Sequence, residues 1–162
     1  MATQPNYKGA LTQYMTHPEE WTYHIPEGMT TMEGALVEPA AVGMHAAVLG
    51  GAQPGKSIVI LGGGTIGLMV LQACISLGAT DITVVDVIEK RLELAKKLGA
   101  ARVINGKEED TVAVLRSEEM YGDHGVDLVF EAAGAVFTAQ QAVQIVSRGG
   151  KIMMVGTQSK PV

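Results

Sequence analysis

The stretch SIVILGGGTIG, residues 57–67, decides the fold of this chain. Its first five residues form a short apolar run rich in β-branched side chains, which predicts a buried strand. An uncharged run over 65–77 then has the length of a crossover helix, and a second apolar run over 81–86 ends on Asp86. A G-x-G-x-x-G pattern becomes specific in this order of strand, glycine-rich turn, helix and acid-ended strand.

The glycine-rich turn predicts a binding site for the diphosphate of a dinucleotide. Gly62 allows the tight turn out of the strand, Gly64 lets the backbone approach the diphosphate, and Gly67 lets the helix pack closely on the strand. The first N–H groups of the helix, from Thr65 and Ile66, would face the phosphate oxygens, where the helix dipole favours negative charge. A purely structural turn and a turn that binds a methyl donor are the alternatives.

Asp86 lies where a carboxylate would meet the ribose of a bound dinucleotide. It would accept hydrogen bonds from both ribose hydroxyls and would repel a 2′-phosphate. We therefore expect NAD rather than NADP as the coenzyme.

The uncharged stretch 57–80 is also long enough to span a bilayer. Three consecutive glycines near its start argue against a spanning helix, because each costs roughly 1 kcal/mol in a helix interior. A strand buried on both faces, followed by a buried helix, gives the same uncharged profile. We therefore expect no membrane-spanning segment and no membrane partner.

The composition is that of a globular protein with the core of one domain. The 162 residues are 47% hydrophobic and 18% charged. A net charge of −5 and a pI near 5.3 disfavour a nucleic-acid partner. Cys74 is the only cysteine, so no disulfide can form within the chain, which fits a reducing cytoplasm. Packing is the ordinary explanation for this residue, and a nucleophile or a metal ligand is the alternative.

Strand-type and helix-type runs alternate through most of the chain. With short connections, this alternation predicts an α/β fold: a Rossmann doubly wound parallel sheet in the order 3-2-1-4-5, with the sixth strand missing. Before the first strand, Thr30 or Thr31 is expected to cap a short helix, and Pro39 to begin or break the next. The expected strands are 57–61, 81–86, 102–104, 126–130 and 151–155, and the expected helices are 65–77, 89–98, 108–120 and 135–147.

Residues 1–30 do not follow this alternation. Residues 1–8 are polar and are expected to fray, and 11–17 alternate in the manner of one strand. That strand has no partner of its own in the segment, so we interpret the segment as the tail of another domain.

The segment EGALVEPAAVGMHA, residues 33–46, is the second distinctive feature. Together with GGGTIG, the strand ending at Asp86 and GVDLVFEAAG at 125–134, it resembles the zinc-dependent medium-chain dehydrogenases. The most similar branch is that of the sorbitol (L-iditol) dehydrogenases, in which an E-P-x-x-V-G-x-H-A segment precedes the coenzyme domain. The resemblance implies an NAD-binding Rossmann domain at 31–162 and, at 1–30, a remnant of a β-rich GroES-like catalytic domain.

The chain also departs from this family. The catalytic domain of its members carries a zinc-binding cysteine and a His-Glu pair, whereas this chain has only Cys74 and no such pair. We therefore expect the chain alone to bind NAD without turnover. The resemblance implies an intact cytoplasmic enzyme, a homo-oligomer, that uses zinc and NAD to oxidise a polyol or another secondary alcohol. A threonine-type dehydrogenase and a non-catalytic NAD-sensing module are the alternatives.

The resemblance also implies roles for individual residues. Glu38 matches the glutamate that approaches zinc in the intact enzyme, although a carboxylate at a helix start would also fit. His45 is either functional or simply packed, and Arg91 matches a basic residue near the adenosine or is a surface arginine. Glu131 is expected to be structural. The loop residues implied to line the nicotinamide are Ala133, Gly134, Val155, Gly156 and Thr157.

Overall fold

The computed structural model describes residues 9–157, which belong to two compact units, 1–35 and 36–162. Each unit is considered by itself. The first contains η1 (Glu19–Trp21) and the start of α1 (Thr31–Gly50). The second continues with β1 (Ser57–Leu61), α2 (Thr65–Ser76), β2 (Asp81–Asp86), α3 (Glu89–Lys97), β3 (Arg102–Asn105), α4 (Thr111–Leu115), β4 (Val126–Glu131), α5 (Val136–Ile145) and β5 (Val146–Met154).

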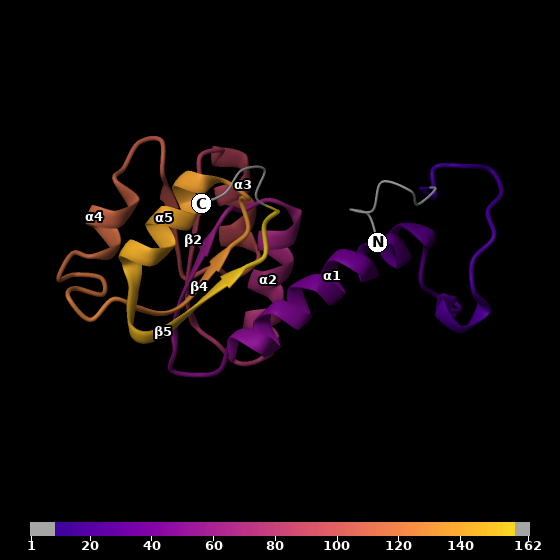
Figure 1. Ribbon diagram of the computed structural model, residues 1–162, viewed down its shortest axis with the longest axis horizontal. Helices are drawn as coiled ribbons and strands as arrows, with labels where there is room; N and C mark the ends of the chain where they lie inside the picture. The colour runs from indigo at the N-terminus through magenta and orange to yellow at the C-terminus, as the bar shows by residue number, and fades with distance from the viewer. Residues whose placement is uncertain (1–8, 158–162) are drawn as a thin grey trace. The chain divides into compact units, whose positions relative to one another are not determined.

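The five strands form one parallel sheet in the order β3-β2-β1-β4-β5 (Figure 1). The predicted strand order is confirmed, and β1 and β2 have the predicted bounds. The first strand lies in the centre, with Ile58 opposite Ile82 of β2 on one side and Leu128 of β4 on the other. Because β1 is covered on both faces, its sequence is a continuous apolar run.

Side chains of β1 alternate between two separate hydrophobic cores. Ile58 and Ile60 pack with buried residues of α1, α2 and α3. Val59 and Leu61 pack on the opposite face with buried residues of α4 and α5. The sheet therefore has helices on both faces, as the doubly wound fold requires.

Cys74 lies in the first of these cores and is fully buried in α2. Burial raises the pKa of its thiol to about 12, so the thiol stays protonated at neutral pH. A protonated thiol is neither a nucleophile nor a metal ligand, and packing is the role that the geometry supports.

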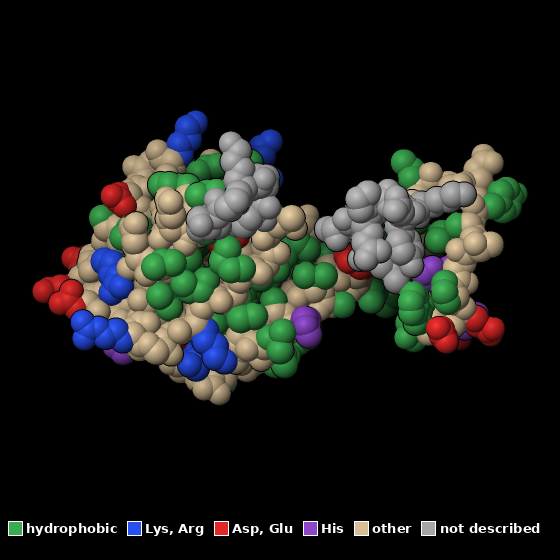
Figure 2. All heavy atoms as spheres, in the orientation of Figure 1, with side chains coloured by type: hydrophobic (Ala, Val, Ile, Leu, Met, Phe, Trp, Pro, Cys, Tyr) green, Lys and Arg blue, Asp and Glu red, His purple; other side chains and the backbone are tan. Residues whose placement is uncertain are grey.

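Charged side chains are scattered over the visible face of the second unit rather than gathered in a basic patch (Figure 2). Within residues 9–157, no helix has both the length and the apolar character needed to cross a bilayer.

The first helix differs from the prediction because it runs unbroken through Pro39. Proline removes one backbone donor and crowds the preceding turn, so a break was the reasonable expectation. The C-terminal half of α1 is held by packing instead: Ala46, Ala47 and Gly50 are buried, and Gly43 lies so close to the backbone of Met69 that it has no room for a Cβ. Tertiary contact therefore outweighs the local cost.

The N-terminus of α1 begins with a capping box. The Thr30 hydroxyl accepts from the Glu33 N–H at 3.2 Å, and the Glu33 carboxylate accepts from the Thr30 N–H at 2.8 Å. The Thr30 N–H also lowers the pKa of Glu33. Thr30, rather than Thr31, is therefore the cap.

The predicted helix at 108–120 is wrong in extent, because α4 covers only five residues. Asp110 fixes its start by accepting from the N–H groups of Val112 and Ala113 at 3.0 and 3.1 Å. Arg116 follows its last residue and donates to the carbonyls of Gly122 and Asp123. These bonds hold the following chain in a turn, so the helix cannot continue.

Two other boundaries differ from the prediction by more than one residue. The helix predicted at 135–147 ends at Ile145, and β5 begins at Val146 rather than at 151. The early start comes from a register shift between β4 and β5. The strand predicted at 11–17 is absent, because no described segment pairs with it.

Asp127 provides a test of how β1 and β4 are joined at their amino ends. Its carboxylate accepts from the Ser57 N–H at 2.9 Å and from the Ser57 hydroxyl at 3.0 Å. The Ser57 N–H is the main cause that lowers the pKa of Asp127. A lowered folded-state pKa stabilises the fold above the unfolded value of about 3.9, and this contribution is lost as pH falls through the folded pKa.

We expect Asp127→Ala to lower the free energy of unfolding by about 1 kcal/mol at pH 7. In urea titrations, the difference from wild type should shrink as the pH falls below about 4. Asp123→Ala, which removes an exposed carboxylate nearby, is the matched control and should change little. A destabilisation by Asp127→Ala that does not vary with pH would contradict the role of the ionised carboxylate.

Candidate functional site

The turn after β1 has the shape that the glycine pattern predicts. Gly62 has φ +109°, a backbone conformation that side chains disfavour, and its N–H donates to the carbonyl of Val85 at 2.8 Å. A Cβ at Gly62 would lie 2.8 Å from the Ala133 nitrogen, and a Cβ at Gly67 would overlap the Gly62 carbonyl oxygen. The turn is therefore packed between two other backbone segments at the carboxyl end of the sheet.

The N-terminus of α2 is open on its outer side. Gly64 is the N-cap, no side chain caps the helix, and a Cβ built at Gly64 meets no atom within 4 Å. The first N–H groups of a helix have no partner inside it, so those of Thr65 and Ile66 are available to an anion. This geometry suits a phosphate group that approaches the backbone closely.

Asp86 ends β2 beside this turn and is only 7% exposed. One carboxylate oxygen, Oδ1, accepts from the N–H groups of Val87 and Ile88 at 2.8 and 2.9 Å. The other, Oδ2, accepts from the Gly63 N–H at 2.7 Å and from Arg91 at 3.4 Å. The carboxylate therefore has a partner in each of its roughly four acceptor directions.

Arg91 makes the longest of these contacts, and its side chain is about half exposed. The guanidinium therefore lies beside Asp86 at the surface of the site. A negative and a positive group stand together at the position predicted for the sugar of a dinucleotide, and their charges would act on a 2′-phosphate in opposite directions.

The loops after β4 and β5 meet at the same edge of the sheet. Glu131 is fully buried, and its Oε1 accepts from Ala133 N–H at 3.0 Å, Gly134 N–H at 2.9 Å and the Thr138 hydroxyl at 2.7 Å. The carbonyl of Glu131 accepts from the N–H groups of Val155 and Gly156, both at 2.8 Å. Glu131 thus holds the loop residues predicted to line the nicotinamide in one cluster.

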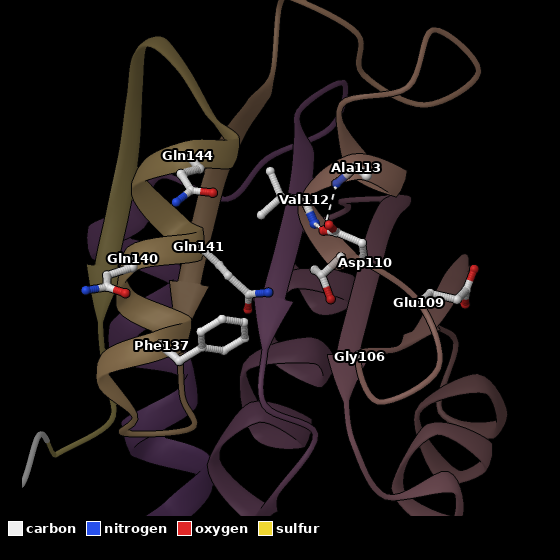
Figure 3. A pocket seen from close by; sticks show the side chains of 10 residues that line it. Gly106, Glu109, Asp110, Val112, Ala113, Phe137, Gln140, Gln141 and Gln144 are labelled. Atoms are coloured by element: carbon white, nitrogen blue, oxygen red, sulfur yellow. Dashed lines mark hydrogen bonds between the residues drawn. The ribbon is translucent and has the colours of Figure 1, made fainter.

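A groove between α4 and α5 lies on one face of the sheet and was not predicted (Figure 3). It has a volume of about 580 Å³ and begins at Gly106, which follows β3. Gln141 of α5 points into it. A sequence signal was present, because Gln141 shares the buried stripe of α5 with Ala142 and Ile145, a position where an amide is unusual.

The residues considered for zinc do not form a metal site. Glu38 and His45 are both exposed on α1, so the packed alternative for His45 is wrong. Seven residues apart on a helix, they lie about 10 Å apart along its axis. Among residues 9–157, no three His, Cys, Asp or Glu side chains cluster as a metal ion requires. The described residues therefore do not fit a zinc ion.

The structure thus brings together the turn at 62–67, Asp86, Arg91 and the loops held by Glu131. A parallel sheet with helices on both faces and a glycine-rich turn after its central strand is a Rossmann fold. The chain belongs to the zinc-binding dehydrogenase family, whose model matches residues 65–162.

Two curated relatives are similar to this chain over almost its whole length. It is 64% identical over 157 residues to the zinc-type alcohol dehydrogenase-like protein YdjJ of Escherichia coli K12, covering 97% of this chain and 45% of that protein. It is 40% identical over 160 residues to sorbitol dehydrogenase of Bacillus subtilis 168, covering 99% and 44%. The chain thus spans under half the length of these relatives.

The chain is also similar to solved structures of dehydrogenases. The chain matches ECK1772, an oxidoreductase/dehydrogenase of unknown specificity from Escherichia coli, with a TM-score of 0.92 and 61% identity over 99% of this chain and 46% of that one. It also matches a protein of Sinorhizobium meliloti 1021 bound to NADP, with a TM-score of 0.81 and 30% identity over 86% and 42%. These likenesses support the medium-chain dehydrogenase fold.

Proposed function

We propose that this chain is the coenzyme-binding part of an alcohol dehydrogenase and that it binds NAD at the carboxyl edge of its sheet. The observation that carries the proposal is the close approach of the 62–67 turn to Asp86, joined by the Gly63 N–H. The turn offers helix N–H groups to a diphosphate, and Asp86 offers a carboxylate to the adjoining ribose.

The proposed coenzyme is NAD rather than NADP. The buried carboxylate of Asp86 would face a 2′-phosphate and repel it, whereas Arg91 is half exposed and screened by water. The Sinorhizobium protein is bound to NADP, so the likeness to that protein does not by itself favour NAD. The preference in this chain therefore depends on Asp86 outweighing Arg91.

The proposed reaction of the intact enzyme is oxidation of a polyol, or of another secondary alcohol, by hydride transfer to the nicotinamide. The sorbitol dehydrogenase relative supports a polyol, and threonine-type oxidation is the second candidate. We place the coenzyme domain at 31–162 and a catalytic-domain remnant at 1–30. Glu38 is the residue of this chain that we propose to approach zinc in the intact enzyme.

A binding experiment tests the coenzyme assignment. Calorimetric titration of the chain should show binding of NADH, weaker binding of NADPH and no binding of S-adenosylmethionine. Asp86→Ala should weaken NADH binding by about tenfold, since a hydrogen bond to a charged group is worth about 1.5–3 kcal/mol and water recovers part of it. In the same variant, the difference in affinity between NADH and NADPH should become smaller.

Glu93→Ala is the matched control because it removes an exposed carboxylate from the neighbouring helix α3. It should bind both coenzymes as wild type does. A folded wild-type sample that binds S-adenosylmethionine but not NADH would contradict the assignment as a dehydrogenase.

A further inference from the structure

A fully buried carboxylate, that of Glu131, lies at the base of the loops after β4 and β5. Glu131 is the last residue of β4 and is opposite Leu61 of β1 and Met154 of β5. Buried carboxylates are rare, because removal from water is costly unless several donors compensate for it. The donors described above come from the two loops and from the first turn of α5. These bonds therefore fix loops rather than the sheet.

The two loops also pack directly on one another. A Cβ at Gly134 would lie 2.8 Å from the carbonyl oxygen of Thr157. A Cβ at Gly156 would overlap the Gly134 nitrogen and lie 2.9 Å from Glu131 Oε2. The carboxylate fixes the loop after β4 through its N–H groups, and the close packing of the main chains passes this position on to the loop after β5.

The order of the strands places these loops on one side of the glycine-rich turn and Asp86 on the other. The turn follows β1, which lies between β2 and β4 in the sheet order β3-β2-β1-β4-β5. With the diphosphate at the turn and one ribose at Asp86, the other half of a dinucleotide would extend over the ends of β4 and β5. The nicotinamide end of the proposed coenzyme would therefore rest on the loops that Glu131 holds.

The bonds that fix the glycine-rich turn are separate from the Glu131 carboxylate. The Gly62 N–H donates to the carbonyl of Val85 at 2.8 Å. The Gly63 N–H donates to the carboxylate of Asp86 at 2.7 Å. Removal of the Glu131 carboxylate should therefore release the loop after β4 and leave the turn and the ribose position unchanged.

We propose that Glu131 is a positioning residue for the nicotinamide end of the coenzyme. This inference rests on the proposed NAD site. Glu131 Oε1 accepts from the N–H groups of Ala133 and Gly134, so the loop after β4 has its final shape before the coenzyme arrives. A surface that is ordered in advance loses less conformational entropy on binding than a loop that the ligand must order. The gain is confined to the part of the ligand that touches these loops.

The test compares NADH with ADP-ribose, which has the same adenosine and diphosphate but no nicotinamide. Calorimetry on the full chain should show that wild type binds NADH more tightly than ADP-ribose. Glu131→Ala should bind ADP-ribose as wild type does and should lose about tenfold in affinity for NADH. A general loss of structure would weaken both ligands alike, so the difference between the two ligands isolates the positioning role.

Three further variants complete the comparison. Glu131→Gln keeps an oxygen that can accept from the same N–H groups and hydroxyl, so its affinity for NADH should stay within about threefold of wild type. Thr138→Val removes one donor to Glu131 at nearly equal volume, and should weaken NADH binding less than Glu131→Ala does without affecting ADP-ribose. Glu119→Ala removes an exposed carboxylate and should change neither affinity.

The outcomes separate this inference from the coenzyme proposal. Equal affinity of wild type for NADH and ADP-ribose would overturn the positioning role and leave the coenzyme site intact. The same holds if Glu131→Ala weakens both ligands alike or neither, or if Glu131→Gln loses as much NADH affinity as Glu131→Ala. If Glu131→Ala does not fold, a Thr138→Val protein without a selective loss of NADH affinity overturns the role. Failure of wild type to bind either ligand would overturn both proposals.

Discussion

Gly67→Ala is expected to abolish NADH binding and to lower the free energy of unfolding by about 3–5 kcal/mol. The added Cβ would overlap the carbonyl oxygen of Gly62 and lie 2.9 Å from its carbonyl carbon. Gly62 cannot move aside, because its N–H is bonded to Val85 and Ala133 lies against its other side. The start of α2 must therefore separate from β1. Urea titration and calorimetry with NADH measure the two effects.

Gly64→Ala is the matched control for this prediction. A Cβ at Gly64 meets nothing within 4 Å, and its φ of −73° suits any residue. The variant should keep its stability and yet bind NADH more weakly, since the methyl group would stand where the diphosphate approaches. A Gly67→Ala protein as stable as Gly64→Ala would disprove the close packing of the turn.

Arg116→Ala is expected to lower the free energy of unfolding by about 2–4 kcal/mol. Nε and Nη2 of Arg116 donate to the carbonyl of Gln144 at 2.9 and 2.7 Å, and Nη1 donates to that of Asp123 at 3.1 Å. Gln144 lies in the last turn of α5, where a cation also complements the helix dipole. Loss of the guanidinium would leave these carbonyls without a charged donor and would release the turn after α4. Chemical denaturation measures the loss.

Two further variants separate the contribution of the Arg116 hydrogen bonds to stability from the contribution of its positive charge. Arg116→Lys keeps the positive charge but cannot reach the same carbonyls together, so it should recover only part of the stability. Arg148→Ala removes an exposed arginine of β5 and should change the free energy of unfolding by less than about 0.5 kcal/mol. Equal effects of Arg116→Ala and Arg148→Ala would show that the carbonyl contacts contribute nothing.

Most of what could be predicted from the sequence came from the spacing of residues that lie close together along the chain. Gly62, Gly67 and Asp86 belong to one strand–helix–strand unit, so their relation depends only on neighbouring elements. The central strand is apolar along its whole length because it is covered on both faces, and this identified the parallel sheet.

Contacts between distant segments explain what the sequence did not reveal. The turn that ends α4 is held by Arg116, whose guanidinium donates to the carbonyls of Gly122 and Asp123. The same guanidinium is held in place by the carbonyl of Gln144, 28 residues away. The continuity of α1 through Pro39 depends on packing against α2. The groove requires α4 and α5 to lie side by side, so nothing near Gln141 in the sequence indicates what its amide faces.

The crowding of donors around Asp86 has a consequence for how a sugar is captured. Its shortest bonds, from Gly63, Val87 and Ile88, fix the orientation of the carboxylate before any ligand arrives. A ribose at the proposed site would therefore compete mainly with the long contact to Arg91, and its hydroxyl groups would replace that one cation. This exchange would require little rearrangement of the main chain. It would release the guanidinium of Arg91 at the edge of the site, and the new contacts of Arg91 would then change the affinity for the coenzyme without altering Asp86.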